Sequence, residues 1–192
     1  MAIPIPKRPS GYAIGAPEAP VTVDVFFDLE CPYSKRGWNH VMQVMKAYSP
    51  QQVRWVFQPM TLSNHRQSWD ATKAAIALAD GDPHRFIKAV SYIFSRQQEF
   101  ANEAWKDKTQ TEFHQRLADY AANAIEGTDK EMFSNQLHSA EVYAEARIPA
   151  RFATIRGVWS TPTFFINGAE ATDLSSGSSL HDWHSVLAPL LD

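Results

Sequence analysis

The sequence contains a single cysteine, Cys31, among its 192 residues. One cysteine excludes an internal disulfide, and with it the small secreted folds that disulfides hold together. The chain also lacks a hydrophobic run near the ~18 residues that a transmembrane helix needs, so we expect no membrane partner. Without a second cysteine or a cluster of histidines and carboxylates, we expect no metal site and no tightly bound cofactor.

The sequence also lacks a large excess of either positive or negative charge. The 18 Lys and Arg residues nearly balance the 21 Asp and Glu residues, which leaves a net charge of -3 and no electrostatic case for binding nucleic acid. At the N-terminus, Lys7 and Arg8 follow the apolar residues, and Pro4, Pro6 and Pro9 interrupt any hydrophobic region. A signal peptide has the opposite order, so a cytoplasmic protein is the default expectation.

The apolar pattern predicts strands at both ends of the chain and a helical block between them. Residues 1–20 are rich in proline and glycine and predict an extended arm. Strands are expected at 21–27 and 53–57, at 163–166, and near 169–172 after the Asn167-Gly168 turn signal.

Helices are marked by their start and stop signals. One helix is expected from Pro32 to the Ser49-Pro50 stop, and a last one over 179–191. Between them the pattern predicts helices at 67–80 and 83–100, two that open with capping boxes at Thr109 and Thr128, and one at 140–156 with a kink or break at Pro149.

Cys31 occupies the junction between the first strand and the first helix, in the run Cys31-Pro32-Tyr33-Ser34. A thiol at a helix start faces unpaired N–H groups and the positive end of the helix dipole, which stabilise a thiolate. We therefore expect an accessible and reactive thiol. A second unusual feature is Pro162, directly before a core strand, where a proline is tolerated if it holds a cis bond in a tight turn.

Together these segments resemble the thioredoxin superfamily, and more narrowly its DsbA-like branch. The resemblance rests on residues 19–33, on residues 157–168 and on the helical block between them, and it extends from about Gly15 to the end of the chain. It implies an α/β thioredoxin fold made of residues 1–64 and 148–192, with residues 1–14 as an extended arm. Residues 65–147 would form an inserted α-helical domain.

The resemblance also implies site residues. Cys31 matches the nucleophilic cysteine of the family, and Pro162 matches the cis-proline that lies beside it. The backbone of Thr161 would then pair with an extended substrate peptide or with glutathione, as an added strand does. Pro32 and Tyr33 match the dipeptide that tunes reactivity.

The chain departs from the family pattern at two positions. Ser34 stands where redox members carry a second, resolving cysteine, and Val25 stands where thioredoxin has a buried acid. A dithiol oxidase is therefore excluded, and the remaining thiol–disulfide chemistry is that of one thiol. Cys31 would attack a disulfide and hold a mixed disulfide with a protein or with glutathione as co-substrate, until another thiol releases it. We expect the Ser34 hydroxyl to donate a hydrogen bond to the thiolate.

Two other functions stay open at this point. The chain is similar to kappa-class glutathione transferases and related isomerases, which activate glutathione with a serine at the helix start, although Ser34 lies one turn too late for that role. Alternatively, the protein is a non-catalytic peptide-binding or chaperone-like module that kept the groove and lost redox cycling.

Four polar or aromatic residues near these motifs have less certain roles. Asp28 and Glu30 precede the nucleophile, where they either oppose thiolate formation or point to solvent. His65 follows the second strand, and a plain loop histidine is the simpler interpretation than one that lines the cleft. Trp159 lies beside the Thr161-Pro162 turn and could shape a substrate groove.

Overall fold

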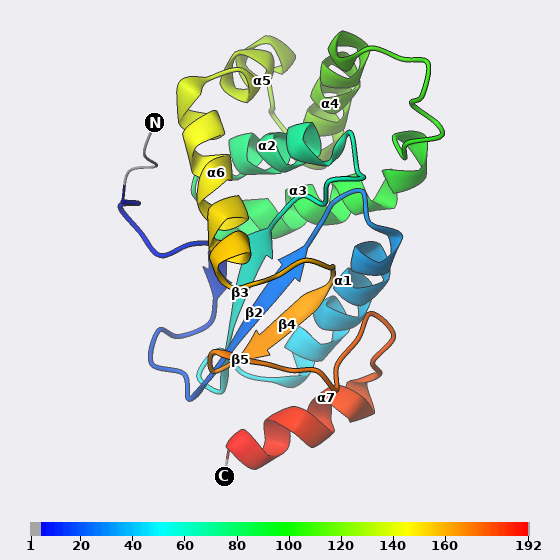
Figure 1. Cartoon of the computed structure of the whole chain (residues 1–192). Coiled ribbons are helices and arrows are strands. Elements are labelled where there is room, and N and C mark those ends of the chain that lie inside the picture. The colour runs from blue at the N-terminus through cyan, green and yellow to red at the C-terminus, as the bar shows by residue number, and fades with distance from the viewer. Residues whose placement is uncertain (1–4, 192) are drawn as a thin grey trace.

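A five-stranded sheet forms the centre of the protein in the computed structural model, which describes residues 5–191 (Figure 1). Its strands lie in the order β1-β3-β2-β4-β5. Their bounds are β1 Tyr12–Ile14, β2 Val21–Phe27, β3 Val53–Pro59, β4 Thr163–Ile166 and β5 Ala169–Glu170. Strands β2 and β3 are parallel, and all the other neighbouring pairs are antiparallel.

Seven α-helices and three short 3-10 helices complete the described residues. The helices of the thioredoxin-like part are α1 Pro32–Val44, α6 Ala140–Ile155 and α7 Leu180–Leu187. Those between β3 and α6 are α2 Ser68–Ala79, α3 Pro83–Ser95, α4 Gln110–Ala124 and α5 Lys130–Leu137. The 3-10 helices are η1 Met45–Ala47, η2 Gln97–Glu99 and η3 Ala188–Leu190. None of the helices described is long and apolar enough to cross a bilayer.

The two faces of the sheet are covered by different helices. Val23, Val25 and Phe27 of β2 belong to the large core that α1, α3 and α7 share with the sheet. The intervening Phe26 faces the other way and stacks on Phe152 of α6, with ring centroids 6.0 Å apart. This alternation follows from the two-residue period of a strand.

Two tryptophans pack helices α1 and α7 against the sheet face that carries Val23, Val25 and Phe27. Trp38 of α1 lies 5.2 Å from Phe27 and 5.0 Å from Phe57, measured between ring centroids. Trp183 of α7 lies 4.9 Å from Phe164 of β4. Each such aromatic pair contributes ~0.5–1.5 kcal/mol beyond its burial. The Trp38 contacts hold α1 against β2 and β3, next to the turn that contains Cys31.

The inserted helices gather around α2, which is buried along almost its whole length and contacts α3, α4, α5 and α6. Small residues make this burial geometrically feasible, since α2 contains five alanines in twelve residues. In Figure 1 the inserted helices lie beyond the end of the sheet at which β2 leads into α1. The predicted fold class, a thioredoxin fold with an inserted helical domain, is confirmed.

Several start signals are also confirmed. Asp82 caps α3 ahead of Pro83, Thr109 and Glu112 form the capping box of α4, and Asn167 and Gly168 both have positive φ in the β4–β5 hairpin turn. At α5 the prediction was wrong by one residue. Asp129, and not Thr128, is the N-cap, because the Asp129 carboxylate accepts the Met132 N–H.

The N-terminal arm contains a strand that the sequence pattern concealed. The predicted extended arm covers residues 1–14, of which the first four lie outside the described part. In this arm Tyr12–Ile14 forms strand β1, which pairs with β3. Tyr12 is almost fully buried and stacks on Phe86 of α3. The sequence pattern did not predict this strand, because its three residues are too few to show an alternation. The glycines on both sides of it are typical of a loop.

The helix at 140–156 contains no break. Helix α6 runs from Ala140 to Ile155 through Pro149, so the predicted boundary between residues 147 and 148 falls inside one continuous helix. Pro149 is buried within this helix, although it has no N–H to donate to the preceding turn.

Candidate active site

Cys31 lies in the turn between β2 and α1, as the N-cap residue of the helix, with Pro32 in the first helical position. Only 4% of the residue is exposed, so the expectation of an accessible thiol was wrong for the free protein. The loop before β4 is responsible. The Cys31 thiol donates a hydrogen bond to the carbonyl oxygen of Thr161, with 3.4 Å between sulfur and oxygen.

The direction of the thiol also differs from the expected one. Within the described residues, the side chain of Cys31 forms no capping hydrogen bond with the first-turn amides of α1. A protonated thiol is a donor, and the Thr161 carbonyl offers it an acceptor that helix N–H groups cannot. The contact depends on the thiol proton, so the sulfur must turn away from Thr161 before it can meet a substrate.

The Thr161–Pro162 peptide bond is cis, as predicted. Pro162 packs directly against α1, and the contact depends on Gly37. A Cβ atom at residue 37 would lie 2.9 Å from Cγ of Pro162, closer than real Cβ contacts allow. The absent side chain of Gly37 therefore lets the helix approach the loop that holds Thr161 beside the sulfur.

Ser34 is buried one turn into α1, and its contact is not the predicted one. Its hydroxyl oxygen accepts the backbone N–H of Asp28 at 3.1 Å, and the contacts of the described residues include no hydrogen bond from Ser34 to sulfur. Ser34 thus ties the helix to the end of β2. The neighbouring Tyr33 is different, since 62% of it is exposed.

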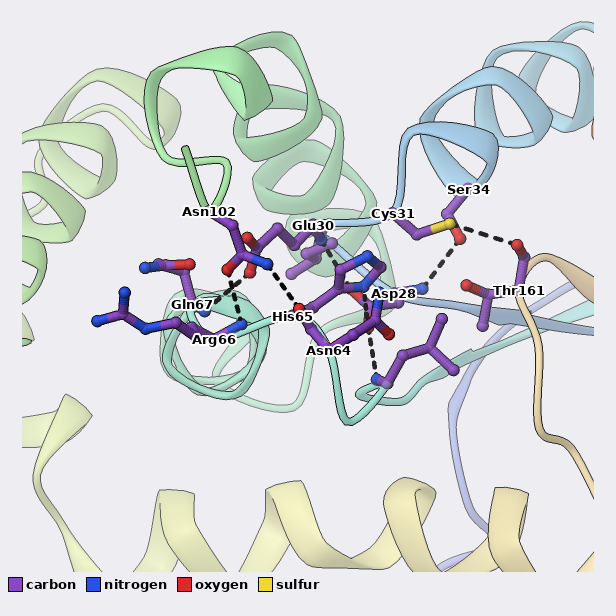
Figure 2. A network of polar contacts seen from close by, with 12 residues as sticks. Asp28, Glu30, Cys31, Ser34, Asn64, His65, Arg66, Gln67, Asn102 and Thr161 are labelled. Atoms are coloured by element: carbon purple, nitrogen blue, oxygen red, sulfur yellow. Dashed lines mark hydrogen bonds and ion pairs between the residues drawn. The ribbon is translucent and has the colours of Figure 1, made fainter. Parts of the chain in front are cut away.

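Asp28 is the centre of a buried polar network below Cys31 (Figure 2). One carboxylate oxygen accepts the Glu30 N–H at 2.7 Å, and the other accepts the Leu62 N–H at 2.6 Å and pairs with Nδ1 of His65 at 3.0 Å. Its backbone carbonyl accepts the Cys31 N–H at 3.1 Å. The alternative that Asp28 and Glu30 point to solvent is therefore wrong, because both are buried.

The network perturbs the ionisation of two of its members. The hydrogen bond to Asp28 raises the pKa of His65, while burial acts in the opposite direction. Burial raises the pKa of Glu30, although its carboxylate accepts the Gln67 N–H at the start of α2 at 2.8 Å. His65 is accordingly an ion-pair partner of the site, and the simpler interpretation as a plain loop histidine was wrong.

A further buried side chain reaches the site from the insertion. Nε2 of Gln97, in η2, donates to the carbonyl oxygens of Leu29 and Cys31, both at 2.9 Å. No sequence pattern predicted this contact, since Gln97 lies at the end of a helical segment, 66 residues from Cys31. Asp28 did carry a signal, because it lies between the apolar residues Phe27 and Leu29 directly before Cys31.

The remaining predicted residues are exposed and lie next in sequence to the Cys31 turn and the cis-proline loop. Trp159 precedes the Thr161-Pro162 turn and is 84% exposed, and Pro32 is exposed at the helix start. Among residues 5–191, no group of three or more His, Cys, Asp or Glu side chains could hold a metal ion. The structure thus brings Cys31, Ser34, Thr161 and Pro162 together, with Pro32 and Tyr33 on the outer side.

These features define the fold class of DsbA-like thiol–disulfide oxidoreductases, a thioredoxin fold with a helical insertion and a cysteine opposite a cis-proline. The chain belongs to the thioredoxin family, since the family model described as Thioredoxin matches residues 7–183.

Solved structures agree on the fold. A candidate protein-disulfide isomerase from Pseudomonas syringae matches with a TM-score of 0.80 and 20% identity over 92% of this chain and 97% of that one. BdbD from Bacillus subtilis matches with a TM-score of 0.73 and 18% identity, covering 94% and 92% of the two chains. DsbA from Chlamydia trachomatis matches with a TM-score of 0.72 and 16% identity, covering 99% and 95%.

Curated relatives are much longer than this chain. The Na(+)/H(+) antiporter NhaA 1 of Mycobacterium sp. (strain KMS) is 27% identical over 158 residues, and that of Mycolicibacterium gilvum is 28% identical over 157 residues. The match covers 80% of this chain and 23% of each relative. The chain therefore corresponds to about a quarter of those proteins.

Proposed function

We propose that this protein catalyses thiol–disulfide exchange with one thiol, that of Cys31, and that glutathione is its co-substrate. The observation that carries the proposal is the placement of the single cysteine, at the start of α1 and 3.4 Å from the carbonyl oxygen that precedes the cis-proline. Because Ser34 occupies the position of a resolving cysteine, Cys31 can form a mixed disulfide but no internal disulfide.

The reaction has two balanced steps. In the first, the Cys31 thiolate attacks one sulfur of a mixed disulfide between a protein and glutathione. A bond forms between Cys31 and glutathione, the original S–S bond breaks, and the protein sulfur leaves as a thiolate that takes a proton from water. In the second, a glutathione thiolate attacks the Cys31 adduct, which regenerates the Cys31 thiolate and releases oxidised glutathione.

Substrate docking would compete with the contact that the free thiol makes. In strand addition an N–H of the substrate backbone bonds to the Thr161 carbonyl, and that oxygen is occupied by the Cys31 thiol in the free protein. A docked substrate would displace the thiol proton from its acceptor and expose the sulfur. Burial of Cys31 before docking is therefore compatible with the proposal.

Because release of the adduct needs an external reduced thiol, we place the reaction in a compartment that keeps glutathione reduced, such as the cytoplasm. An oxidising compartment would leave Cys31 blocked. Fluorescence microscopy of the tagged protein in its native host tests this placement.

The contacts of Ser34 weigh against the transferase-like alternative, since its hydroxyl is buried and accepts the Asp28 N–H. The peptide-binding alternative is favoured by one observation, the exposed aromatic side chains of Tyr33, two residues after Cys31, and Trp159, two residues before Thr161. A peptide-holding module would bind extended peptides equally well with Cys31→Ser.

Turnover separates these functions. A glutathionylated peptide is incubated with reduced glutathione and the protein, and release of free peptide is followed by chromatography. We expect multiple turnovers with the natural sequence and the uncatalysed rate with Cys31→Ser. Equal rates for the two proteins would refute the exchange function.

A further inference from the structure

The peptide groups around Cys31 are all held by hydrogen bonds. The backbone carbonyl of Asp28 accepts the Cys31 N–H at 3.1 Å. The carbonyl oxygens of Leu29 and Cys31 both accept from Nε2 of Gln97, at 2.9 Å each. The Cys31 carbonyl also accepts the Lys35 N–H at 3.1 Å, which begins the hydrogen-bond ladder of α1. The backbone is therefore fixed on both sides of the Cys31 Cα atom, and with it the direction in which the side chain leaves the chain.

Gln97 bridges the two carbonyls from the inserted helical domain. It belongs to η2, 66 residues from Cys31 along the chain, and only 1% of it is exposed. Its amide oxygen has no hydrogen-bond partner among the described residues. Every side-chain hydrogen bond of Gln97 in this part of the chain thus goes to the turn that carries Cys31.

Aromatic packing fixes the position of Gln97 itself. Phe94, three residues earlier in α3, lies 5.9 Å from Phe27 of β2 and 5.7 Å from Trp38 of α1, measured between ring centroids. Closely packed side chains in a core transmit displacements to one another. Gln97 therefore reaches the turn from a support that rests on the same strand and helix that Cys31 connects.

A second contact from the insertion holds the same turn. The Glu30 carboxylate accepts the Gln67 N–H at 2.8 Å, directly before α2. Asn102, shortly after η2, donates to the Asn64 carbonyl at 2.6 Å and accepts the Arg66 N–H at 3.2 Å (Figure 2). The η2 segment and the loop before α2 are thus tied to each other as well as to the turn.

We propose that Gln97 is a positioning residue for exchange at Cys31: its amide holds the backbone on both sides of the nucleophile and so fixes how the sulfur meets a docked disulfide. The proposal rests on the proposed function, because it concerns the same reaction. The thiol has to leave the Thr161 carbonyl before it reacts, so the backbone is the part of Cys31 that keeps its place. The side chain then swings toward the substrate from a fixed origin.

Positioning matters more for a disulfide than for a small reagent. Attack on a disulfide needs the sulfur aligned with the S–S bond that breaks, and a displacement of about 1 Å can slow such a reaction by about 100-fold. Iodoacetamide is small and is not docked, so it can approach the sulfur from any open side. The two reactions together therefore separate the position of the sulfur from its accessibility.

Gln97→Met tests the proposal, because methionine has a similar volume and no N–H to donate. Each protein is mixed with glutathionylated peptide, and the first transfer of glutathione to Cys31 is followed by rapid quenching and mass spectrometry. We expect the maximal rate of transfer to fall about tenfold in Gln97→Met, and the half-saturating peptide concentration to change less than about twofold. Alkylation of Cys31 by iodoacetamide should change less than about threefold, since it needs no alignment.

Gln98→Met is the matched control, since Gln98 is the exposed neighbour of Gln97 in η2, and it should transfer glutathione at the natural rate. Transfer at the natural rate by Gln97→Met would show that the contact is only structural and would overturn the proposal. Equal losses of transfer and alkylation, or a raised half-saturating concentration with an unchanged maximal rate, would overturn it as well. If the natural sequence accepts no glutathione from the peptide, the proposed function fails, and this proposal fails with it.

A measurement on the natural sequence needs no variant to fold. The two Nε2 protons of Gln97 each bond to a buried carbonyl, so NMR should show slow exchange of both with solvent. A positioning residue keeps its contacts while the sulfur reacts. We therefore expect the same slow exchange in the free protein and in the glutathione adduct of Cys31. Rapid exchange of these protons in the adduct would overturn the proposal.

Discussion

The sulfur of Cys31 and the carbonyl oxygen of Thr161 lie 3.4 Å apart, although 130 positions of sequence separate them. The contact joins the start of α1 to the loop before β4, and the whole inserted helical block lies between the two in sequence. It holds the thiol of the free protein in a buried position, against the carbonyl oxygen to which a substrate strand would bond in the proposed function.

Gly37 of α1 lies against Pro162, the residue that follows Thr161. In Gly37→Ala the new Cβ would meet Cγ of Pro162 at 2.9 Å, so the loop must move. Overpacking costs ~1–3 kcal/mol, against ~1 kcal/mol gained from helix propensity. We expect a small net loss of stability in urea unfolding, together with faster alkylation of Cys31. Unchanged alkylation would show that Gly37 does not hold the Thr161 loop; Gln43→Ala, exposed on the same helix, is the control.

Ser34→Cys would restore a resolving thiol one turn from the nucleophile. We expect this variant to form an internal disulfide, and its glutathione adduct at Cys31 to disappear within the time over which the natural protein retains it. Mass spectrometry after exposure to oxidised glutathione distinguishes a protein that has lost two hydrogens from one that carries glutathione. A persistent adduct in Ser34→Cys would contradict the view that position 34 alone prevents disulfide storage.

The ion pair of His65 with Asp28 also predicts how stability depends on pH. The folded protein holds the His65 proton more tightly than the unfolded chain, because the hydrogen bond to Asp28 raises the pKa. The pair therefore stabilises the fold fully below the unfolded histidine value of ~6.5. That stabilisation is lost as the pH rises through the raised value.

Urea unfolding of the natural protein and of His65→Gln at several pH values measures this contribution. The difference in unfolding free energy should shrink as the pH rises from about 6 upward, and the six other histidines cancel in the comparison. A difference that grows with pH would have the wrong sign for the ion pair.

Trp159→Ala tests the exposed aromatic side chains as a peptide surface. Because Trp159 is 84% exposed, the change should alter stability by no more than ~0.5 kcal/mol. Loss of an aromatic anchor typically weakens binding by ~1–3 kcal/mol, so affinity for an extended apolar peptide should fall about tenfold. Fluorescence anisotropy in a Cys31→Ser background measures it. Met132→Ala, also exposed but on α5, should leave the affinity unchanged.

Local sequence signals predicted most elements of this fold, because strand alternation, helix caps and the Asn167-Gly168 turn act over a few residues. They also identified Cys31 and Pro162, whose neighbours in sequence mark them as unusual. What they missed depends on contacts between distant segments. The direction of the Cys31 thiol is set by Thr161, the burial of Asp28 by the loop that carries Leu62 and His65, and the Gln97 contact by the docking of the insertion on the turn.

Strand β1 was missed for a related reason. Tyr12 and Ile14 favour a strand, but three residues are too few to show an alternation, and Tyr12 is held in place by its contact with Phe86 of α3. The strand also depends on its pairing with β3, which lies about 40 residues later and cannot be predicted from the local sequence.

In the proposed function, Cys31 exchanges with a disulfide brought to it and retains the product until another thiol releases it. The most direct measurement is mass spectrometry of the intact protein after incubation with oxidised glutathione, followed by peptide mapping. We predict the addition of one glutathione, located on Cys31, stable after removal of the reagent and reversed by excess reduced glutathione. A protein that keeps its original mass under native conditions, while the urea-unfolded chain is modified, would contradict the account.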